Sequence, residues 1–341
     1  METKPALAGL FPGEIAELLK PLQPFRAGQI HQWICKGAVS FADMNNLPAA
    51  LRDELERRFR LFSGSVSAEL EDPDGTVKFR ISFEDSVKIE SVILASSEGR
   101  KTACLSTQAG CPIGCVFCKT GQMGFTRDLS SREIIEELLF LTRRERGISH
   151  IVIMGMGEPL LNLKELRRAV AYFTDILKIS KRRITLSTSG VTGGIWDFTD
   201  NGPDIRLALS LTTGRQELRE RLMPVAQSNP LAELKESLMY YQQKRKRRIT
   251  LEAVLLGGVN TTPADAAALA GFARGLDAVV NLIPWNPVDG LCFEGKPLRS
   301  PGAAETAGFA SALKEKGLNV TFRYKKGRGV LGACGQLGQQ E

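Results

Sequence analysis

The chain contains the run Cys111-Pro-Ile-Gly-Cys115-Val-Phe-Cys118, and this stretch constrains the fold of everything around it. Three thiolates at this spacing can hold three corners of a 4Fe-4S cluster and leave the fourth iron open. A structural zinc site normally has four ligands in paired clusters, and the two histidines, His31 and His150, supply no second pair. The run therefore favours a cluster over zinc or ordinary thiols.

A cluster with one open iron can chelate the amino and carboxylate groups of S-adenosylmethionine and cleave it reductively to a 5′-deoxyadenosyl radical. The spacing C-x3-C-x2-C, with the aromatic Phe117 just before the last cysteine, is typical of radical S-adenosylmethionine enzymes. The sequence thus predicts two cofactors, the cluster and S-adenosylmethionine.

Composition favours a globular protein that binds a polyanion. The 341 residues suffice for one large and one smaller domain, and an apolar content of 43% is enough for a sizeable core. The formal net charge is +7, and basic residues gather in runs at 181–183, 244–248 and 323–328. Each run alone fits a solvated helix end, but the three together favour RNA or DNA as a partner.

The chain carries no sign of membrane insertion or secretion. No apolar stretch is long enough to cross a bilayer, and Glu14 and Glu17 lie where a signal peptide needs an uncharged segment. Seven cysteines, three of them clustered, fit a reducing compartment that keeps thiols available for iron. We expect a cytoplasmic protein without structural disulfides and, since no association segment stands out, a monomer.

The first hundred residues are predicted to form a helical module and a hairpin. Apolar residues recur at helical spacing through residues 12–60, as in Ile15, Leu18 and Leu19. Apolar and polar residues then alternate between residues 75 and 94, which indicates a β-hairpin that contains Glu90.

Beyond residue 100 the pattern alternates between strands and helices. Strands are expected at residues 102–107, 150–154, 184–187, 205–211, 249–255, 279–283 and 320–323. Helices are expected after the capping box Ser130-x-x-Glu133, over residues 163–177, and from residues 231, 264 and 303. This alternation predicts an α/β fold, a partial (βα)6-type barrel with its active site at the carboxyl ends of the strands.

Four domains follow from these patterns. Residues 1–65 are expected to form a helical RNA-binding accessory domain, 66–98 a linking β-hairpin, 99–324 the barrel and 325–341 a flexible, glycine-rich tail.

Several polar residues fall at predicted strand ends. Gly157 permits close backbone approach to a ligand, and Glu158 can pair with an ammonium such as that of methionine, although a plain strand-end turn would look the same. Ser187 and Ser210 can bond the cofactor's carboxylate or ribose. Asn286 is suited to contact an adenine edge, or simply forms an Asn-Pro turn.

Two cysteines outside the cluster run also stand out. Cys104 lies seven residues before the run, and Cys334 lies in the glycine-rich tail, where a thiol on a mobile segment is chemically available. We interpret Cys35 and Cys292 as packing residues, and His31 and His150 as structural.

Together these motifs resemble the RlmN/Cfr family, radical S-adenosylmethionine methyltransferases that methylate an adenosine of 23S ribosomal RNA. The resemblance covers nearly the whole chain: residues 25–30, the cluster run, and residues 155–162, 185–190, 281–287 and 333–337. The last segment is specific to this family, because most radical enzymes have no such terminal cysteine.

The resemblance implies a methyl relay that consumes two S-adenosylmethionine molecules per turnover. Cys334 takes a methyl group from the first, and cleavage of the second gives the radical that activates the S-methyl for addition to the adenine. Glu90 matches the family's general base, which removes the ring proton. Cys104 then attacks the sulfur of Cys334, which frees the methylated RNA and leaves a disulfide for external reduction.

The resemblance also implies the remaining contacts and partners. The positions that match the family's cofactor-binding residues are Gly157, Glu158, Ser187, Ser210, Leu211, Thr212 and Asn286. An electron donor such as flavodoxin must reduce the cluster, and the target adenosine must leave its stack to be reached.

Two departures from the family pattern are visible. Members usually have histidine where this chain has Thr212, and acidic residues where it has 328–331. We expect Thr212 to alter cofactor affinity without abolishing activity, whereas the missing acids put tail docking and RNA positioning in question.

Three functions stay open at this point. We favour methylation of carbon 2 of adenosine in 23S ribosomal RNA, with transfer RNA as a second candidate substrate, because this is the commoner activity of the family. Methylation of carbon 8 uses the same apparatus. A non-catalytic iron-sulfur RNA-binding protein is disfavoured, because it would not need Cys104, Cys334 and Glu90 together.

Overall fold

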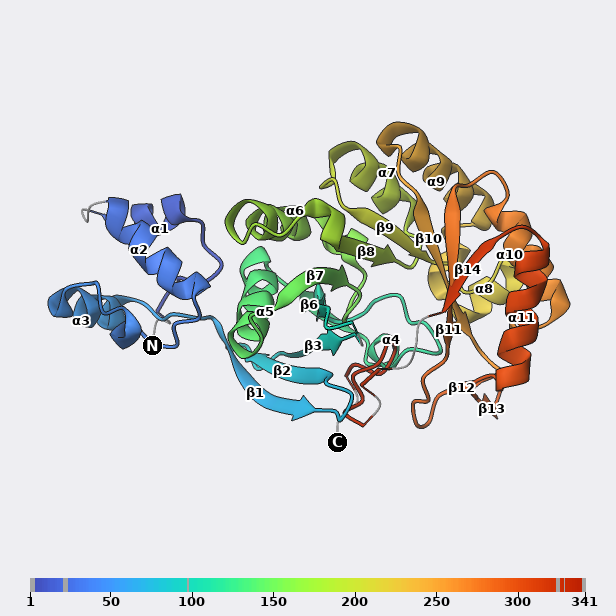
Figure 1. Ribbon diagram of the computed structural model, residues 1–341, viewed down its shortest axis with the longest axis horizontal. Coiled ribbons are helices and arrows are strands. Elements are labelled where there is room, and N and C mark those ends of the chain that lie inside the picture. The colour runs from blue at the N-terminus through green and yellow to red at the C-terminus, as the bar shows by residue number, and fades with distance from the viewer. Residues whose placement is uncertain (1–3, 21–23, 97, 323–325, 328, 339–341) are drawn as a thin grey trace.

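A single curved sheet runs through the molecule (Figure 1). The computed structural model describes residues 4–20, 24–96, 98–322, 326–327 and 329–338. Within these residues the sheet has ten strands in the order β1-β2-β3-β4-β7-β8-β9-β10-β11-β14. The pairings from β1 to β4 are antiparallel, and those from β4 to β14 are parallel. The predicted α/β fold is confirmed, as an open rather than a closed barrel in the described part.

The predicted parallel strands all form, with small shifts at their ends. The strands of the main sheet are β1 (Gly64–Glu71), β2 (Val77–Phe83), β3 (Lys88–Ala95), β4 (Lys101–Leu105), β7 (Ile148–Ile153), β8 (Ile184–Thr188), β9 (Arg206–Ser210), β10 (Ile249–Leu255), β11 (Ala278–Pro284) and β14 (Asn319–Phe322). Two separate two-stranded antiparallel sheets are formed by β5 (Gln108–Gly110) with β6 (Phe125–Asp128), and by β12 (Cys292–Phe293) with β13 (Lys296–Pro297). Residue 323, predicted to end the last strand, lies outside the described residues.

Helices cover the convex side of the parallel strands in Figure 1. They are α5 (Ser131–Arg144), α6 (Leu163–Ala171), α7 (Thr192–Asn201), α8 (Gln216–Leu222), α9 (Leu231–Arg245), α10 (Pro263–Ala273) and α11 (Ala303–Glu315), with α4 (Lys119–Gln122) beside the cluster run. The predicted capping box is confirmed: Ser130 Oγ accepts from the Glu133 N–H at 3.3 Å, and Glu133 accepts from the Ser130 N–H at 2.7 Å. In the described residues, no helix combines the length and apolarity needed to cross a membrane.

The N-terminal module consists of α1 (Pro12–Leu18), α2 (Pro24–Cys35), the 3-10 turn η1 (Phe41–Asp43) and α3 (Ala49–Arg58). Its helical character is as predicted. The module packs onto the rest through a buried contact, because the Tyr172 hydroxyl lies 2.9 Å from His31 Nε2. Tyr172 begins a π-helical turn that follows α6 (Tyr172–Ile176).

The predicted hairpin forms from β2 and β3, but it is part of the main sheet and is preceded by β1. The sequence analysis missed β1, although Val66, Ala68 and Leu70 alternate there with serine and glutamate. The strand also contains glycine, alanine and two glutamates, which have low strand propensity, and it is largely exposed at the edge of the sheet. The domain boundaries at residues 65, 98 and 324 stay predictions.

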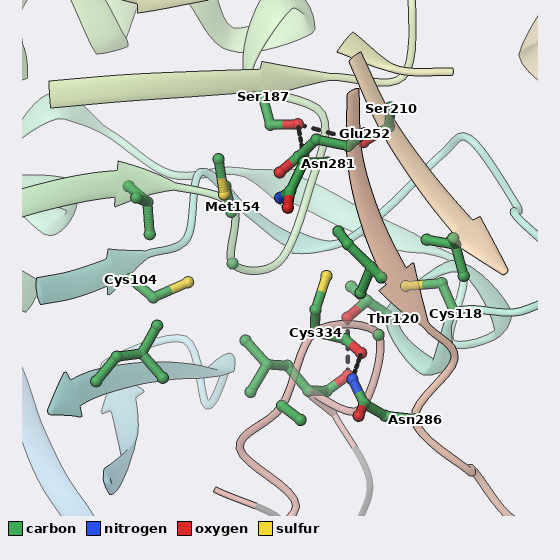
Figure 2. Close-up of a pocket in the computed structure, with 18 of the residues that line it drawn as sticks. Cys104, Cys118, Thr120, Met154, Ser187, Ser210, Glu252, Asn281, Asn286 and Cys334 are labelled. Atoms are coloured by element: carbon green, nitrogen blue, oxygen red, sulfur yellow. Dashed lines mark hydrogen bonds between the residues drawn. The ribbon is translucent and has the colours of Figure 1, made fainter. Parts of the chain in front are cut away.

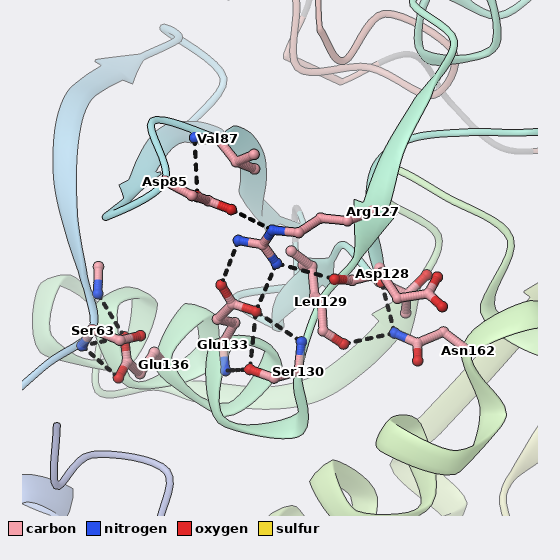
Figure 3. Close-up of polar contacts among 12 residues, drawn as sticks. Ser63, Asp85, Val87, Arg127, Asp128, Leu129, Ser130, Glu133, Glu136 and Asn162 are labelled. Carbon is pink, nitrogen blue, oxygen red and sulfur yellow. Dashed lines mark hydrogen bonds and ion pairs between the residues drawn. The ribbon is translucent and has the colours of Figure 1, made fainter. Parts of the chain in front are cut away.

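Carboxylate side chains join α5 to the first strands of the sheet (Figure 3). Glu136 of α5 accepts hydrogen bonds from the N–H groups of Ser63 (2.7 Å) and Gly64 (3.0 Å) and from the Ser63 hydroxyl (2.8 Å), at the point where β1 begins. Arg127 of β6 pairs with Asp85 and with Glu133, which ties the β2–β3 turn to the start of α5.

We expect Glu136 to make stability depend on pH. Burial raises the pKa of Glu136 from 4.5 to about 7, despite the three donors that favour its ionised form. The folded chain thus holds this proton more tightly than the unfolded chain. Proton binding by Glu136 therefore contributes fully to the free energy of unfolding below pH 4.5, and this contribution is lost as the pH rises through 7. Its size is up to roughly 3 kcal/mol.

Urea denaturation of the wild type and of Glu136→Gln at pH 5 and pH 7.5 tests this. The free energy of unfolding should fall less between these pH values in the variant, because glutamine does not titrate. Parallel pH dependences in the two proteins would show that Glu136 does not bind the proton.

Candidate active site

A cavity of about 690 Å³ opens on the concave side of the sheet, at the carboxyl ends of the parallel strands. Its walls come from β3, β4, β7 to β11, the cluster run and the tail. The site residues predicted from the sequence that line it are Cys104, Cys111, Cys115, Cys118, Gly157, Glu158, Ser187, Ser210, Asn286 and Cys334. Figure 2 shows the cavity with ten of its residues labelled. Tertiary structure therefore gathers motifs that are up to 230 residues apart in the chain.

Backbone hydrogen bonds shape the loop that carries the three clustered cysteines. The Cys111 N–H donates to Gly124 O at 2.8 Å, and the Val116 N–H donates to Leu222 O at 3.0 Å. The residue just before β6 and the end of α8 thus hold the two halves of the loop. Trp285 Nε1 donates to Phe117 O at 2.8 Å. None of the described cysteines forms a disulfide.

The chemistry of this loop fits an iron-sulfur cluster. Burial raises the pKa of the Cys115 and Cys118 thiols, and raises that of Cys111 to about 12, so iron must displace their protons. No three His, Cys, Asp or Glu side chains among the described residues are arranged to hold a single ion. A 4Fe-4S cluster does not require three ligands around one ion, because each thiolate binds a different iron.

A buried guanidinium group lies behind the same loop. Arg219 of α8 is fully buried, and it donates from Nε to Leu211 O at 3.2 Å and from Nη2 to Ser189 O. Its Nη1 has no hydrogen-bond partner among the described residues, and its charge acts on the Cys115 thiol. A cationic donor without a partner beside a cluster cysteine is suited to the negative charge of a bound cluster.

The glycine loop after β7 is shaped by close packing. Gly157 has φ of +103°, and a Cβ there would lie 2.6 Å from the side chain of Gln108. Glu158 is buried and accepts from the Ser189 N–H and hydroxyl, both at 2.7 Å, and from the Leu160 N–H at 3.1 Å. Burial raises its pKa. Oε2 accepts both bonds from Ser189, whereas Oε1 accepts the bond from Leu160 and keeps acceptor capacity for a ligand ammonium. The pairing of Glu158 with methionine stays a prediction.

A carboxylate that the sequence analysis did not single out completes the polar wall. Ser187 donates to Glu252 at 2.8 Å, and the hydroxyls of Ser187 and Ser210 lie 3.2 Å apart (Figure 2). Glu252 and Asn281 both line the cavity, from the neighbouring strands β10 and β11. The available signal was a charged residue inside the mostly apolar strand Ile-Thr-Leu-Glu-Ala-Val-Leu.

Leu211 and Thr212 lie behind this wall and do not line the cavity. Their backbone N–H groups donate to Glu252 O, at 2.9 and 3.1 Å. Thr212 has φ of +63°, which is strained for a β-branched residue, and its buried hydroxyl has no partner among the described residues. Direct cofactor binding by these two residues stays a prediction.

The described part of the tail is docked across the cavity. Lys119 N–H donates to Gly335 O at 2.8 Å, and the Thr120 hydroxyl donates to Leu337 O at 2.7 Å, so both bonds join the tail to α4. The amide of Asn286 donates to Cys334 O at 3.1 Å, which means that Asn286 here contacts the tail backbone. Its buried Oδ1 has no partner among the described residues.

The docking of the tail does not need acidic residues in the tail itself. Asp74 accepts from the Gly327 N–H at 2.8 Å, and Asp72 accepts from the Gly329 N–H at 2.5 Å. Both aspartates belong to the β1–β2 turn. Most of the basic run at residues 323–328, namely 323–325 and 328, lies outside the described residues.

Glu90 of β3 is buried among cations and covered by the tail. One carboxylate oxygen lies 3.4 Å from Lys78 Nζ and 3.3 Å from Arg80 Nη2, and the other accepts from the Gly338 N–H at 2.8 Å. Lys78 is itself only 2% exposed. Glu90 is not among the residues that line the cavity in this arrangement.

Cys104 and Cys334 both point their sulfur atoms into the cavity (Figure 2). Cys104 is buried and lies next to the last residue of β4, whereas Cys334 is exposed on the tail. In the view of Figure 2 the Cys334 sulfur lies between those of Cys104 and Cys118. The two thiols predicted to act in sequence therefore share one cavity with the cluster cysteines.

Comparison with known families agrees with this site. Residues 105–270 match the radical SAM superfamily, and residues 14–61 match the ribosomal RNA large subunit methyltransferase N-terminal domain. The first match implies a 4Fe-4S cluster and S-adenosylmethionine as cofactors.

Similar proteins span the whole chain. The probable dual-specificity RNA methyltransferase RlmN of Treponema denticola is 46% identical, over 98% of this chain and 96% of that protein. A counterpart in Thermus thermophilus is 42% identical, over 95% of this chain and 92% of that protein. A crystal structure of a radical SAM methyltransferase from Sphaerobacter thermophilus is 35% identical, with a TM-score of 0.92 over 98% of this chain and 99% of that one. The chain therefore belongs to the RlmN family of radical S-adenosylmethionine RNA methyltransferases.

Proposed function

We propose that this chain methylates carbon 2 of an adenine in 23S ribosomal RNA, and also in transfer RNA, through a methyl group carried on Cys334. The observation that carries the proposal is the shared cavity: Cys334 and Cys104 line it together with the three cluster cysteines. The relatives are named as probable dual-specificity RNA methyltransferases, which supports two RNA substrates. Cytoplasmic location and a monomeric state stay predictions.

The cofactors have a matching set of donors. Cys111, Cys115 and Cys118 would hold the 4Fe-4S cluster, and the polar groups of Ser187, Ser210, Glu252 and Asn281 would hold S-adenosylmethionine. When bound, the reduced cluster supplies one-electron cleavage of S-adenosylmethionine, and an acidic electron carrier such as flavodoxin supplies the electron.

The residues of the chain then divide the remaining work. The Cys334 thiolate attacks the methyl carbon of one S-adenosylmethionine and takes the methyl group, and S-adenosylhomocysteine leaves. A second S-adenosylmethionine is consumed in removing one hydrogen from that S-methyl, which activates it for addition to the adenine ring. Glu90 takes up the ring proton as the adduct collapses. The Cys104 thiolate attacks the Cys334 sulfur and displaces the methylated RNA, and external thiols must supply two electrons to reduce the resulting disulfide.

The proposed reaction requires the Glu90 carboxylate to become uncovered. The Gly338 N–H occupies one oxygen of the carboxylate, while Lys78 and Arg80 lie beside the other. Glu90 can reach the substrate only after the end of the tail moves away. Single hydrogen bonds of this kind cost little to break, about 1 kcal/mol net, or somewhat more for a charged acceptor.

The decisive experiment follows the label of a methyl group. We expect the reconstituted chain, given unmodified 23S ribosomal RNA and S-adenosylmethionine with a trideuterated methyl, to yield 2-methyladenosine that has lost one deuterium. Cys334→Ser should give no product, while the matched control Cys292→Ser, on an exposed short strand, should stay active. Nucleoside mass spectrometry measures both. Three retained deuteriums would contradict the relay, and 8-methyladenosine would change the target carbon.

Removal of the second thiol should trap the relay at its last step. With Cys104→Ser, the RNA cannot be displaced from Cys334, so a covalent protein–RNA adduct should accumulate. Denaturing gel electrophoresis with labelled RNA measures the adduct, and Cys35→Ser serves as a control at a thiol outside the cavity. Normal turnover by Cys104→Ser would exclude its role in resolving the adduct.

Arg219 should tune the bound cluster. Replacing its buried positive charge by Arg219→Met should lower the reduction potential of the cluster, because the extra electron loses a nearby cation. Arg219→Lys should recover part of the shift. A redox titration followed by electron paramagnetic resonance measures the potential, with Arg221→Met, exposed on the same helix, as a control. Equal potentials in all four proteins would show that Arg219 only supports the fold.

A further inference from the structure

Three arginines gather around His150 at the amino-terminal end of the concave face. Arg100 directly precedes β4, Arg183 directly precedes β8 and Arg206 begins β9, while His150 lies in β7. Since β4, β7, β8 and β9 are successive neighbours in the sheet, these residues come from four adjacent strands at the same end. We call Arg100, Arg183, Arg206 and His150 the basic cluster.

Strand register brings the basic cluster together. Thr102, two residues after Arg100, pairs with His150, and Thr185, two residues after Arg183, pairs with Arg206. The positive charges of all three arginines act on His150 and, after burial, are what lowers its pKa. Three guanidinium groups therefore lie within electrostatic reach of one imidazole.

The charge of the basic cluster is not neutralised within the described chain. Nearby arginines are paired: Arg247 with Asp204 and Arg248 with Asp277, each at 2.8 Å. By contrast, the exposed side chains of Arg100, Arg183 and Arg206 form no hydrogen bond or ion pair with any described residue. Like charges held close together repel, so an anion from outside the chain would relieve an unfavourable arrangement.

The basic cluster is continuous with the active site. Arg100 and Thr102 line the same cavity as Cys104 and Cys334. Arg100 precedes Cys104 by four residues in an extended strand, which corresponds to about 13 Å at roughly 3.3 Å per residue. That span is short enough for one RNA strand to place a base in the cavity and its own phosphates at the arginines at the same time.

We infer that the basic cluster binds phosphate groups of the RNA strand that presents its adenine to the cavity. This inference rests on the proposed RNA methylation. Guanidinium groups bind phosphate oxygens in a bidentate manner, and such contacts fix the position of a strand without reading its sequence. An acidic electron-donor protein is the alternative partner, but the cavity that Arg100 lines also holds the thiols that must meet RNA, which favours the nucleic acid.

The salt dependence of RNA binding tests the inference. Affinity for an in vitro transcribed 23S ribosomal RNA fragment is measured by fluorescence anisotropy over a salt series, with the whole chain. The triple variant Arg100→Gln, Arg183→Gln, Arg206→Gln should reduce the slope of log K against log salt by about 2, since each single-strand phosphate contact contributes about 0.7. Single variants should each remove about a third of this.

Two control proteins make the result specific. Arg274→Gln removes an exposed arginine at the end of α10, away from the cavity, and should leave the slope unchanged. Replacement of the same three arginines by lysine should keep most of the slope of log K against log salt, because counterion release depends on the number of positive charges that contact phosphates. A thermal unfolding curve of each variant verifies folding.

The failures of the two proposals are distinguishable. If the wild type methylates RNA while the triple glutamine variant keeps the wild-type slope, the phosphate site is wrong and the proposed function stands. In another outcome, the triple glutamine variant binds RNA normally, but flavodoxin reduces its 4Fe-4S cluster more slowly and with a weaker salt dependence. The basic cluster would then bind the electron donor and not RNA. If the wild type does not methylate RNA at all, the proposed function itself fails.

Discussion

The site depends on a buried hydrogen-bond network centred on Ser106, just after β4. Its hydroxyl donates to Glu90 O at 2.7 Å and accepts from the Met156 N–H at 2.8 Å, and its own N–H donates to Glu137 at 2.8 Å. Glu137 also accepts from Ser91, and burial raises its pKa well above the usual range. One residue thus joins the strand of Glu90, the approach to the cluster run and the glycine loop, so their relative positions are fixed together.

Around that network the cavity is closed by a segment that must also move. The tail brings Cys334 into the cavity through hydrogen bonds to α4, Asn286, the β1–β2 turn and Glu90. Most of these are single bonds to backbone groups, each of modest free energy. The tail is therefore positioned well enough to present a thiol, yet held by contacts that can be exchanged one at a time as its partners change.

Charge is distributed unevenly between the interior and the surface of the site. Buried groups such as Arg219 and Glu158 are held by hydrogen bonds to backbone and hydroxyl groups, and Arg219 Nη1 has no partner among the described residues. The exposed arginines beside His150 have no acidic partners among the described residues. Arg219 inside and the exposed arginines outside both suit negatively charged occupants, whereas the Glu158 carboxylate suits a cationic group.

Local patterns in the chain were enough to establish the cofactor chemistry, the family and the succession of parallel strands, because these depend on spacing and period: three cysteines, a capping box at Ser130, and apolar strands of regular length. They did not lead us to β1, where a short alternation of apolar and polar residues is combined with residues of low strand propensity. They also did not single out Glu252, whose role appears only when β10 lies beside the serines of β8 and β9. From the sequence we also predicted that Asn286 contacts an adenine. In this arrangement its amide donates to the backbone of the tail. Those facts arise from contacts between segments far apart in the chain, which only the folded sheet brings within hydrogen-bond distance.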